Sequence, residues 1–355
     1  MTYYTSFFTW LPGSVFVIRE YITSFNKYSL LNMSSEVIQC NNETGYVAIT
    51  PSTFSKFAYS VTASIALVGN LCVVYMFARR RKLLKKSHNR CILNLALTDI
   101  FTALSVLSNP GMVLDETFYQ VSSQSYLTRE LYCRIIWSKC LPFSLGITSL
   151  YICVIISLER WLAVRKSFFY KNRFTTWHMN VLIVGCWIAG FASEIPITVI
   201  TTGIYDNSSK ICRLDMHNKA MSIVILLGHS LVPFTLIFAA YVDVFRGIRE
   251  SLRFIATAGS KNFSSQKRLK KVTQMTAITS FILVLCWFPN HVYFFLLTFG
   301  YLPFNKNPDD VANIIFGVLA FFNSCLNPFI YVFSNPVFRK AFQELFCGFS
   351  CFKRG

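Results

Sequence analysis

Polar side chains that lipid should reject occur inside long apolar runs of this sequence. They are Asn70, Asp99, Ser149, Asn323, Ser324 and Asn327. A charged or amide side chain inside a membrane costs on the order of several kcal/mol unless it is partnered, so each residue marks a candidate functional site. A carboxylate among amide and hydroxyl oxygens could hold a small cation or a proton. A water-filled hydrogen-bond network that only packs the helices is an equally good interpretation.

A second polar group is expected at the inner ends of the same runs. Glu159 and Arg160 are adjacent opposite charges, and Ser149 lies about three helical turns before Arg160 on the same helix face. Tyr241 and Tyr331 are expected at the same level. This convergence favours a shared function over an isolated ion pair.

Prolines inside the apolar runs predict bends, because proline removes a backbone hydrogen bond of the helix. Pro233, Pro289 and Pro328 interrupt the last three runs. In Cys286-Trp287-Phe288-Pro289 the large ring of Trp287 directly precedes the break, which suits a hinge with a lever. Trp287 as ordinary core filling is the alternative, and the combined bends favour a moving helix.

Seven apolar runs must position these side chains. They lie at about 57–78, 91–114, 140–158, 181–200, 221–245, 277–299 and 311–333 of the 355 residues. Each reaches the ~20 residues that cross a bilayer as a helix. We therefore predict an all-α membrane protein, a seven-transmembrane helix bundle. No nucleophile or metal-ligand constellation of an enzyme occurs, and the spans leave no room for a soluble catalytic domain.

The net charge of +18 comes from lysines and arginines gathered on one side of the spans, in the first, third and fifth connections and in the tail. By the positive-inside rule this side is cytoplasmic, so the charge needs no nucleic acid and suits anionic membrane lipid. We expect an extracellular N-terminal tail at 1–53, the bundle at 54–334 and a short amphipathic helix with a cytoplasmic tail at 335–355. The expected location is the plasma membrane.

The two faces also predict covalent modifications. Glycosylation sequons on the outer side begin at Asn32, Asn42 and Asn207. Cys133 and Cys212 both lie on the oxidising face, so a disulfide between loop and helix is expected, which leaves Cys40 without an obvious partner. Cys347 and Cys351 follow the amphipathic stretch, where palmitoylation is favoured over free thiols.

The ordered set of motifs from about 54 to 347 resembles the rhodopsin-like (class A) family of G-protein-coupled receptors. The matching motifs are Gly69-Asn70, Leu95-Ala96-Leu97-Thr98-Asp99, Cys133, Glu159-Arg160-Trp161, Trp187, Pro233 with Tyr241, Cys286-Trp287-Phe288-Pro289 and Asn327-Pro328-Phe329-Ile330-Tyr331. The resemblance implies a sodium site at Asp99, Ser149, Asn323 and Asn327. It also implies that the sixth span swings outward and exposes Arg160 to a heterotrimeric G protein. The implied activation residues are Glu159, Arg160, Tyr241, Trp287, Pro289, Asn327, Pro328 and Tyr331.

Three features depart from the family pattern. Cys133 lies two residues further from Arg160 than is usual, and we expect a bulge at Pro142 to absorb the excess. Leu283 replaces a common phenylalanine one turn before Trp287. The start of the sixth span is basic from Lys267 to Lys271, so an ionic lock to Arg160 is not expected.

The ligand class follows from residues at family positions. Pro142 replaces the aspartate that pairs with amines, and Phe321 replaces the lysine that opsins need for retinal. Residues expected to line the outer cavity are Asn109, Pro142, Phe143, Asn290, His291, Phe294, Asn313 and Phe316. This polar and aromatic lining suits a peptide, so we hypothesise a receptor of the neuropeptide type.

Alternatives within the family are a small-molecule or lipid receptor, or an orphan with constitutive activity. An ion-coupled transporter is the alternative from another class, but it predicts an inverted repeat and broken helices that the sequence does not show. Arrestin binding, if it depends on phosphorylation, should use Ser260, Ser264 and Ser265.

Overall fold

The computed structural model describes residues 53–110, 112–114, 125–206, 211–214, 219–258, 263–302, 311–334, 336, 338–340 and 342–344. Of these, the side chains of 196–206, 211–214, 254–258, 263–268 and 311 are not described. The long helices are α2 (Thr53–Arg79), α3 (Ser87–Leu107), α5 (Cys140–Arg165), α7 (Thr176–Thr201), α9 (Val232–Ala258), α10 (Phe263–Thr298) and α11 (Val311–Ser334). Shorter helices are α4 (Tyr126–Leu131), α6 (Ser167–Arg173) and α8 (Lys219–Leu226).

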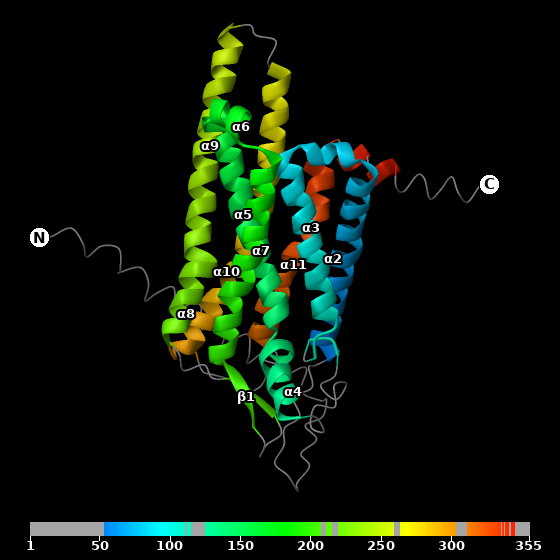
Figure 1. The fold of residues 1–355 in the computed structure, drawn as a ribbon, viewed down its shortest axis with the longest axis vertical. Helices are drawn as coiled ribbons and strands as arrows, with labels where there is room; N and C mark the ends of the chain where they lie inside the picture. The colour runs from blue at the N-terminus through cyan, green and yellow to red at the C-terminus, as the bar shows by residue number, and fades with distance from the viewer. Residues whose placement is uncertain are drawn as a thin grey trace, which may run out of the picture.

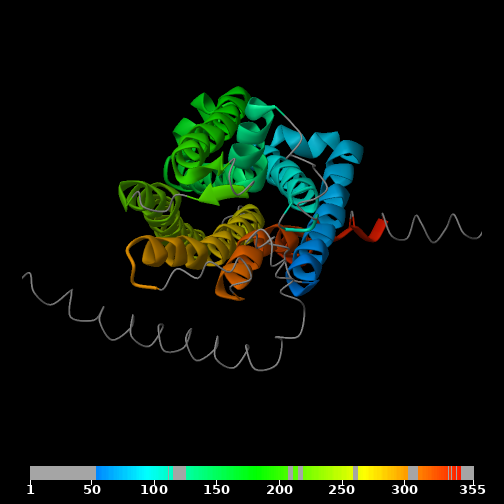
Figure 2. The ribbon, with the colours of Figure 1, turned by 90° about the horizontal axis from the view of Figure 1, so that it is seen from below.

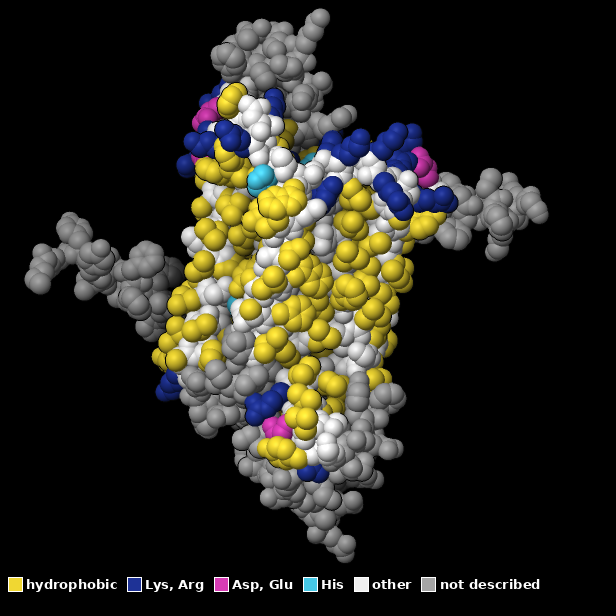
Figure 3. Space-filling model, in the orientation of Figure 1, with side chains coloured by type: hydrophobic (Ala, Val, Ile, Leu, Met, Phe, Trp, Pro, Cys, Tyr) yellow, Lys and Arg dark blue, Asp and Glu magenta, His cyan; other side chains and the backbone are white. Residues whose placement is uncertain are grey.

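The predicted seven spans are confirmed, since the described residues hold 7 helices long and apolar enough to cross a membrane. The fifth of these spans runs from Lys219 to Arg253 and is continuous through α8, the π-helical turn η5 (Leu227–Leu231) and most of α9. Apolar side chains such as Phe57, Val68 and Leu285 are more than half exposed on the outside of the helices. Figure 3 shows them as a broad belt, with lysines and arginines gathered at the end that the positive-inside rule makes cytoplasmic.

Helix α5 lies inside the bundle and makes contacts with α3, α7, α9 and α10 (Figures 1 and 2). Its buried residues form much of the main apolar cluster, together with side chains of α3, α10 and α11. In contrast, α7 lies at the edge, with only 22% of its spanning window buried. A side chain on α5 can therefore reach most of the helices that could move.

A short antiparallel hairpin covers the outer end of the bundle, which the all-α prediction did not include. Strand β1 (Thr202–Asp206) pairs with β2 (Ile211–Leu214), with Tyr205 opposite Cys212. Both strands contact the π-helical turn η4 (Tyr132–Trp137), which contains Cys133 (Figure 1). Cys133 is disulfide-bonded. Its pairing with Cys212 stays a prediction, because the side chain of Cys212 lies outside the described residues.

The expected bulge at Pro142 was placed wrongly. The backbone departs from α-helix earlier, in the π-helical turn η4 and at Lys139, which has a positive φ of 62°. Helix α5 then starts at Cys140, so Pro142 lies in its first turn, where a missing backbone N–H costs nothing. The excess between Cys133 and Arg160 is thus absorbed before the proline.

Residues after α11 continue in helical conformation at 338–340 and 342–344, where the chain turns away from the bundle axis (Figure 1). Phe338 is buried there against Phe77 and Tyr331, with ring centroids 5.7 and 5.6 Å apart. Several predictions lie outside the described residues. They concern the sequons at Asn32, Asn42 and Asn207, the palmitoylation of Cys347 and Cys351, the partner of Cys40, and Ser260. Ser264 and Ser265 lie in the first turn of α10 rather than in a loop, and their side chains are not described.

Candidate functional site: a polar core and an inner switch

Asp99 lies at the centre of the bundle with no exposed surface. Ser324 donates a hydrogen bond of 2.8 Å to one of its carboxylate oxygens, and the side-chain amide of Asn327 donates one of 2.8 Å to the other. Asp99 has no cationic partner among the described residues. The buried carboxylate therefore keeps acceptor capacity and is met only by neutral donors.

The other predicted members of this polar core are all buried but are not all bonded to Asp99. Ser149 donates to the hydroxyl of Thr98 at 2.8 Å, and the Asn323 amide donates to the backbone carbonyl of Ala320 at 2.6 Å. Asn70 bridges two helices by donating to the backbone oxygens of Ala66 and Ser324, both at 2.9 Å. The core is thus a network that links α2, α3, α5 and α11.

Glu159 and Arg160 form a bidentate pair at the inner end of α5. The Nε and Nη2 atoms of Arg160 donate to the two carboxylate oxygens of Glu159, at 2.5 and 2.6 Å. Their side chains are 1% and 4% exposed. Both charges belong to one helix, so the pair does not itself hold α5 to a neighbour.

Two residues that sequence reasoning missed hold this pair from outside α5. The hydroxyl of Tyr170, on α6, donates to Glu159, and the Nδ1 atom of His88 lies 3.3 Å from Nη2 of Arg160. Burial and the neighbouring Glu159 carboxylate raise the pKa of Tyr170 well above its ordinary value, so the hydroxyl stays protonated and can donate. No sequence signal marks Tyr170, because α6 folds back onto α5 only in the tertiary structure.

Sequence reasoning also missed a second ion pair, which joins α5 to α9. It lies closer to the inner end of α5 than the Glu159–Arg160 pair. Arg165 donates to both carboxylate oxygens of Asp243, at 2.9 and 2.5 Å, and to Glu250 at 2.8 Å. Trp161 donates its indole N–H to Asp243 at 2.8 Å. Unlike the Glu159–Arg160 pair, this cluster crosses between two spans.

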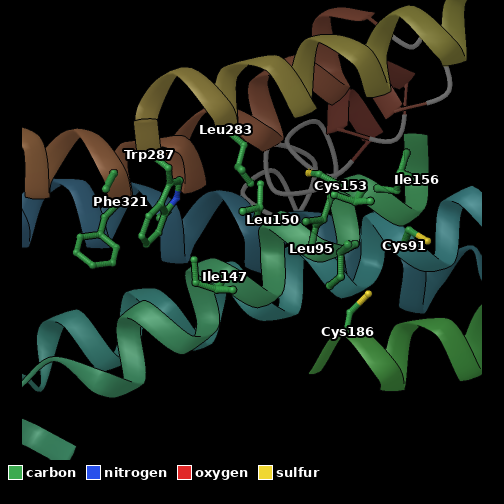
Figure 4. Close-up of a cluster of buried hydrophobic side chains, with 14 of the residues drawn as sticks. Cys91, Leu95, Ile147, Leu150, Cys153, Ile156, Cys186, Leu283, Trp287 and Phe321 are labelled. Atoms are coloured by element: carbon green, nitrogen blue, oxygen red, sulfur yellow. The ribbon is translucent and has the colours of Figure 1, made fainter. Parts of the chain in front are cut away.

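Trp287 is fully buried two residues before Pro289, and its ring occupies space that a glycine leaves open. It faces α5 from α10, beside Ile147 and Leu150, with Phe321 next to it (Figure 4). A Cβ added to Gly146 would lie 2.0 Å from the Trp287 ring. Phe143 and Phe321 surround the same ring, with centroids 5.8 and 5.9 Å away. The role of Gly146 could have been suspected only from a glycine inside an apolar helix.

Tyr241 and Tyr331 are each 1% exposed in the inner half of the bundle. The ring of Tyr241 packs on Phe281 of α10 with centroids 6.0 Å apart. The hydroxyl of Tyr331 has no hydrogen-bond partner among the described residues. An unpaired buried hydroxyl costs about 1–3 kcal/mol, so a rearrangement that pairs it would be favoured.

The predicted ligand-facing residues divide into those near Trp287 and those elsewhere. His291 is buried, hydrogen-bonds through Nδ1 to the hydroxyl of Ser230, and stacks obliquely on Trp287 with centroids 5.6 Å apart. Pro142 is buried, whereas Phe143 is half-buried. Asn109 instead ties two elements together, since its amide donates to the backbone oxygen of Ile136 at 2.7 Å.

The remaining four predicted ligand residues lie nearer the outer end and are more open. Asn290, Phe294 and Phe316 are half-buried, and Asn313 is exposed. Phe316 packs on Tyr293 with ring centroids 5.3 Å apart. These positions leave them free to meet a ligand but do not by themselves define a pocket.

Sequence reasoning also missed two titratable residues beside His291. The Nδ1 atom of His229 lies 3.8 Å from a carboxylate oxygen of Glu194, and the His229 ring centroid is 6.1 Å from that of His291. The three residues come from the fourth, fifth and sixth spans. This polar cluster adjoins Trp287 through His291, so it connects the outer half of the bundle to the hinge.

Comparison with known proteins agrees with this geometry. Residues 69–331, most of the chain, match the 7 transmembrane receptor (rhodopsin family). The galanin receptor 2a of Danio rerio is 27% identical over 307 residues, which cover 84% of this chain and 79% of that protein. The somatostatin receptor type 2 of Sus scrofa is 27% identical over 333 residues, covering 89% and 84%, and the somatostatin receptor type 1 of Rattus norvegicus is 26% identical over 299 residues, covering 82% and 71%.

The match spans all the motifs that form the polar core, the hinge and the inner pair. It covers more than half of the chain and agrees with the seven spans of the structure. The chain therefore belongs to the rhodopsin family of seven-transmembrane receptors.

Proposed function

We propose that this chain is a plasma-membrane receptor that binds an extracellular peptide and activates a heterotrimeric G protein. The similar proteins named above are receptors for galanin and somatostatin by their names. The basic inner face supports a cytoplasmic partner on that side and an extracellular N-terminus. Family membership favours this function over an ion-coupled transporter.

The observation that carries the proposal is that Arg160 has no salt bridge to another span among the described residues. Within the described part of the chain, its carboxylate partner is Glu159 on the same helix. The contacts from other elements come from His88 and, through Glu159, from Tyr170. No described residue of α10 forms an ion pair with Arg160, as the basic start of the sixth span had indicated. An outward movement of α10 would therefore open the inner face without first breaking a salt bridge to Arg160.

Trp287 supplies the proposed coupling to the outer side. Its ring fills the space above Gly146 and contacts His291, which lies on the outer side of Pro289. A ligand that displaces His291 or Phe143 would move the Trp287 ring against α5. The ring already lies so close to Gly146 that a side chain there would clash with it, so the movement would push on the helix. Because packed cores switch between discrete arrangements, such a shift would be passed on to α10 as a whole.

The proposal includes a sodium ion beside Asp99. The donor set fits, because the carboxylate is fully buried and has no cationic partner among the described residues. The hydroxyl oxygen of Ser324 lies beside it, and the amide oxygen of Asn323 lies 3.4 Å from that hydroxyl. Asp99, Ser149, Asn323 and Asn327 would hold the ion, with Ser324 as a further oxygen. The ion would supply a positive charge that balances Asp99 in the resting arrangement.

The test is nucleotide exchange on purified heterotrimeric G protein by the receptor in nanodiscs. A peptide library that includes galanin and somatostatin peptides is screened, and a hit should raise exchange in the wild type. Gly146→Val should abolish the response while surface expression is kept, whereas Gly185→Val is the matched control because nothing lies within 4 Å of a Cβ there. A peptide response that survives in Gly146→Val equally well would contradict the proposed coupling through Trp287.

A further inference from the structure

A cavity of about 680 Å³ lies at the cytoplasmic end of the bundle, outside the polar core and the hinge. Its walls come from α9, α10 and the end of α11, helices that lie next to one another in Figure 2. Phe245, Ile278, Phe281 and Phe333 supply the apolar part. Phe333 is 73% and Ile278 45% exposed, so the cavity opens towards the surrounding lipid.

Two cations lie at the rim of this cavity. Lys271 is near the start of the sixth span, and Arg339 follows the end of the seventh, so both lie at the boundary between membrane and cytoplasm. Neither has a carboxylate partner among the described residues, and the described residues that line the cavity include no acid. Arg339 uses two N–H groups to cap α11 at the backbone oxygens of Val332 and Phe333 and keeps further donors.

We propose that this cavity binds an anionic phospholipid of the inner leaflet whose headgroup carries a phosphate monoester, such as a phosphoinositide. The headgroup phosphate lies between Lys271 and Arg339, and the first part of an acyl chain lies against Ile278, Phe281 and Phe333. This occupant satisfies both halves of the site, since a soluble anion would leave the aromatic walls in contact with water. A zwitterionic lipid would leave the two cations unmatched.

The bound lipid bridges two helices that the proposed activation separates. Phe281 forms one wall of the cavity and packs on Tyr241, with ring centroids 6.0 Å apart. On the other side Arg339 directly follows Phe338, which packs on Tyr331. The lipid therefore stabilises the arrangement described here, in which α10 stays against α11.

The test measures binding of a fluorescent phosphatidylinositol bisphosphate to the purified full chain in neutral detergent micelles. Lys271→Ala/Arg339→Ala should weaken binding on the order of thirtyfold, from about 1 kcal/mol for each lost cation. The matched control is Lys270→Ala/Lys340→Ala, because both lysines are exposed neighbours that do not line the cavity. It removes the same charge and should weaken binding by less than about threefold.

A second set of measurements distinguishes binding of the whole lipid from binding of its headgroup alone. Phe333→Ser removes apolar wall at a largely exposed position and should weaken binding several-fold without loss of folding, which a thermal melt checks. Soluble inositol trisphosphate should compete poorly, and zwitterionic phosphatidylcholine not at all. Equal losses in the two double variants, or equal competition by the soluble headgroup, would overturn the site. None of these measurements uses G protein, so they stand apart from the proposed receptor function.

Discussion

Two arginines on α5 hold carboxylates at the inner end of the bundle in opposite ways. Arg160 is buried and is paired with Glu159 on its own helix, whereas Arg165 is 29% exposed and reaches Asp243 and Glu250 on α9. Burying the Glu159–Arg160 pair costs desolvation free energy, although the pair does not join two spans. The contacts of Arg165 with Asp243 and Glu250 hold α5 to α9. The difference indicates that the buried pair serves a change of partner and that the exposed pair serves fixed packing.

The largest effect is expected from Arg160→Ala, which removes the group proposed to meet the G protein. Agonist-stimulated nucleotide exchange should fall on the order of 100-fold. Loss of one partner from a buried pair also destabilises by about 3–5 kcal/mol, so exchange is normalised to the amount of ligand-binding receptor. Arg165→Ala is the matched control and should keep most of the exchange. Equal losses in both variants would erase the distinction between the two arginines.

A smaller effect is expected from Tyr170→Phe, which removes the hydroxyl that donates to Glu159. A hydrogen bond to a charged group contributes about 1.5–3 kcal/mol, and its loss frees the buried pair to rearrange. Ligand-independent exchange should rise on the order of tenfold or more, since each 1.4 kcal/mol corresponds to about a factor of ten. The neighbouring Phe168→Leu, at a position that is 80% exposed, should leave exchange unchanged. A fall in ligand-independent exchange in Tyr170→Phe would speak against a restraining role.

Asp243→Asn should lower stability more than signalling. The amide can still accept from Trp161 but loses the ion pair with Arg165. Because the two side chains are 29% and 37% exposed and are screened by solvent, we expect the melting temperature of the purified receptor to fall by roughly 2–4 °C. A double-mutant cycle with Arg165→Ala isolates the interaction, and additive shifts would show that the two side chains do not act together.

The smallest effect is expected from Glu250→Gln. Its carboxylate is 65% exposed, so its contact with Arg165 is strongly screened, and the melting temperature should change by less than about 1 °C. A shift as large as that of Asp243→Asn would mean that the α5–α9 cluster depends on all three charges.

Much of the bundle could be predicted because length, hydropathy and basic ends constrain each span independently. The burial of Asp99, Arg160 and Tyr331 followed from the cost of polar groups in lipid. The partners did not follow, because they depend on how elements far apart in the chain meet. Tyr170 and Glu194 are examples, and Asn109 bonds to a backbone carbonyl where a ligand contact was expected.

The local backbone at the outer end of α5 could not be predicted either. A positive φ at a lysine, such as Lys139, has no sequence signature, whereas a glycine there would have suggested it. The proline nearby gave the more visible signal and led to the wrong position for the bulge.

The turn at Lys139 also changes how positions on the third span can be compared with those of related receptors. The spacing from Cys133 to Arg160 is two residues longer than the family pattern. The position equivalent to a given family residue therefore differs by two residues, more than half a helical turn, depending on whether it is counted from Cys133 or from Arg160. Inward from Cys140 the helix is regular, so equivalent faces must be counted outward from the cytoplasmic end. A ligand contact on this helix that is placed by counting from Cys133 would therefore be assigned to the opposite side of the helix.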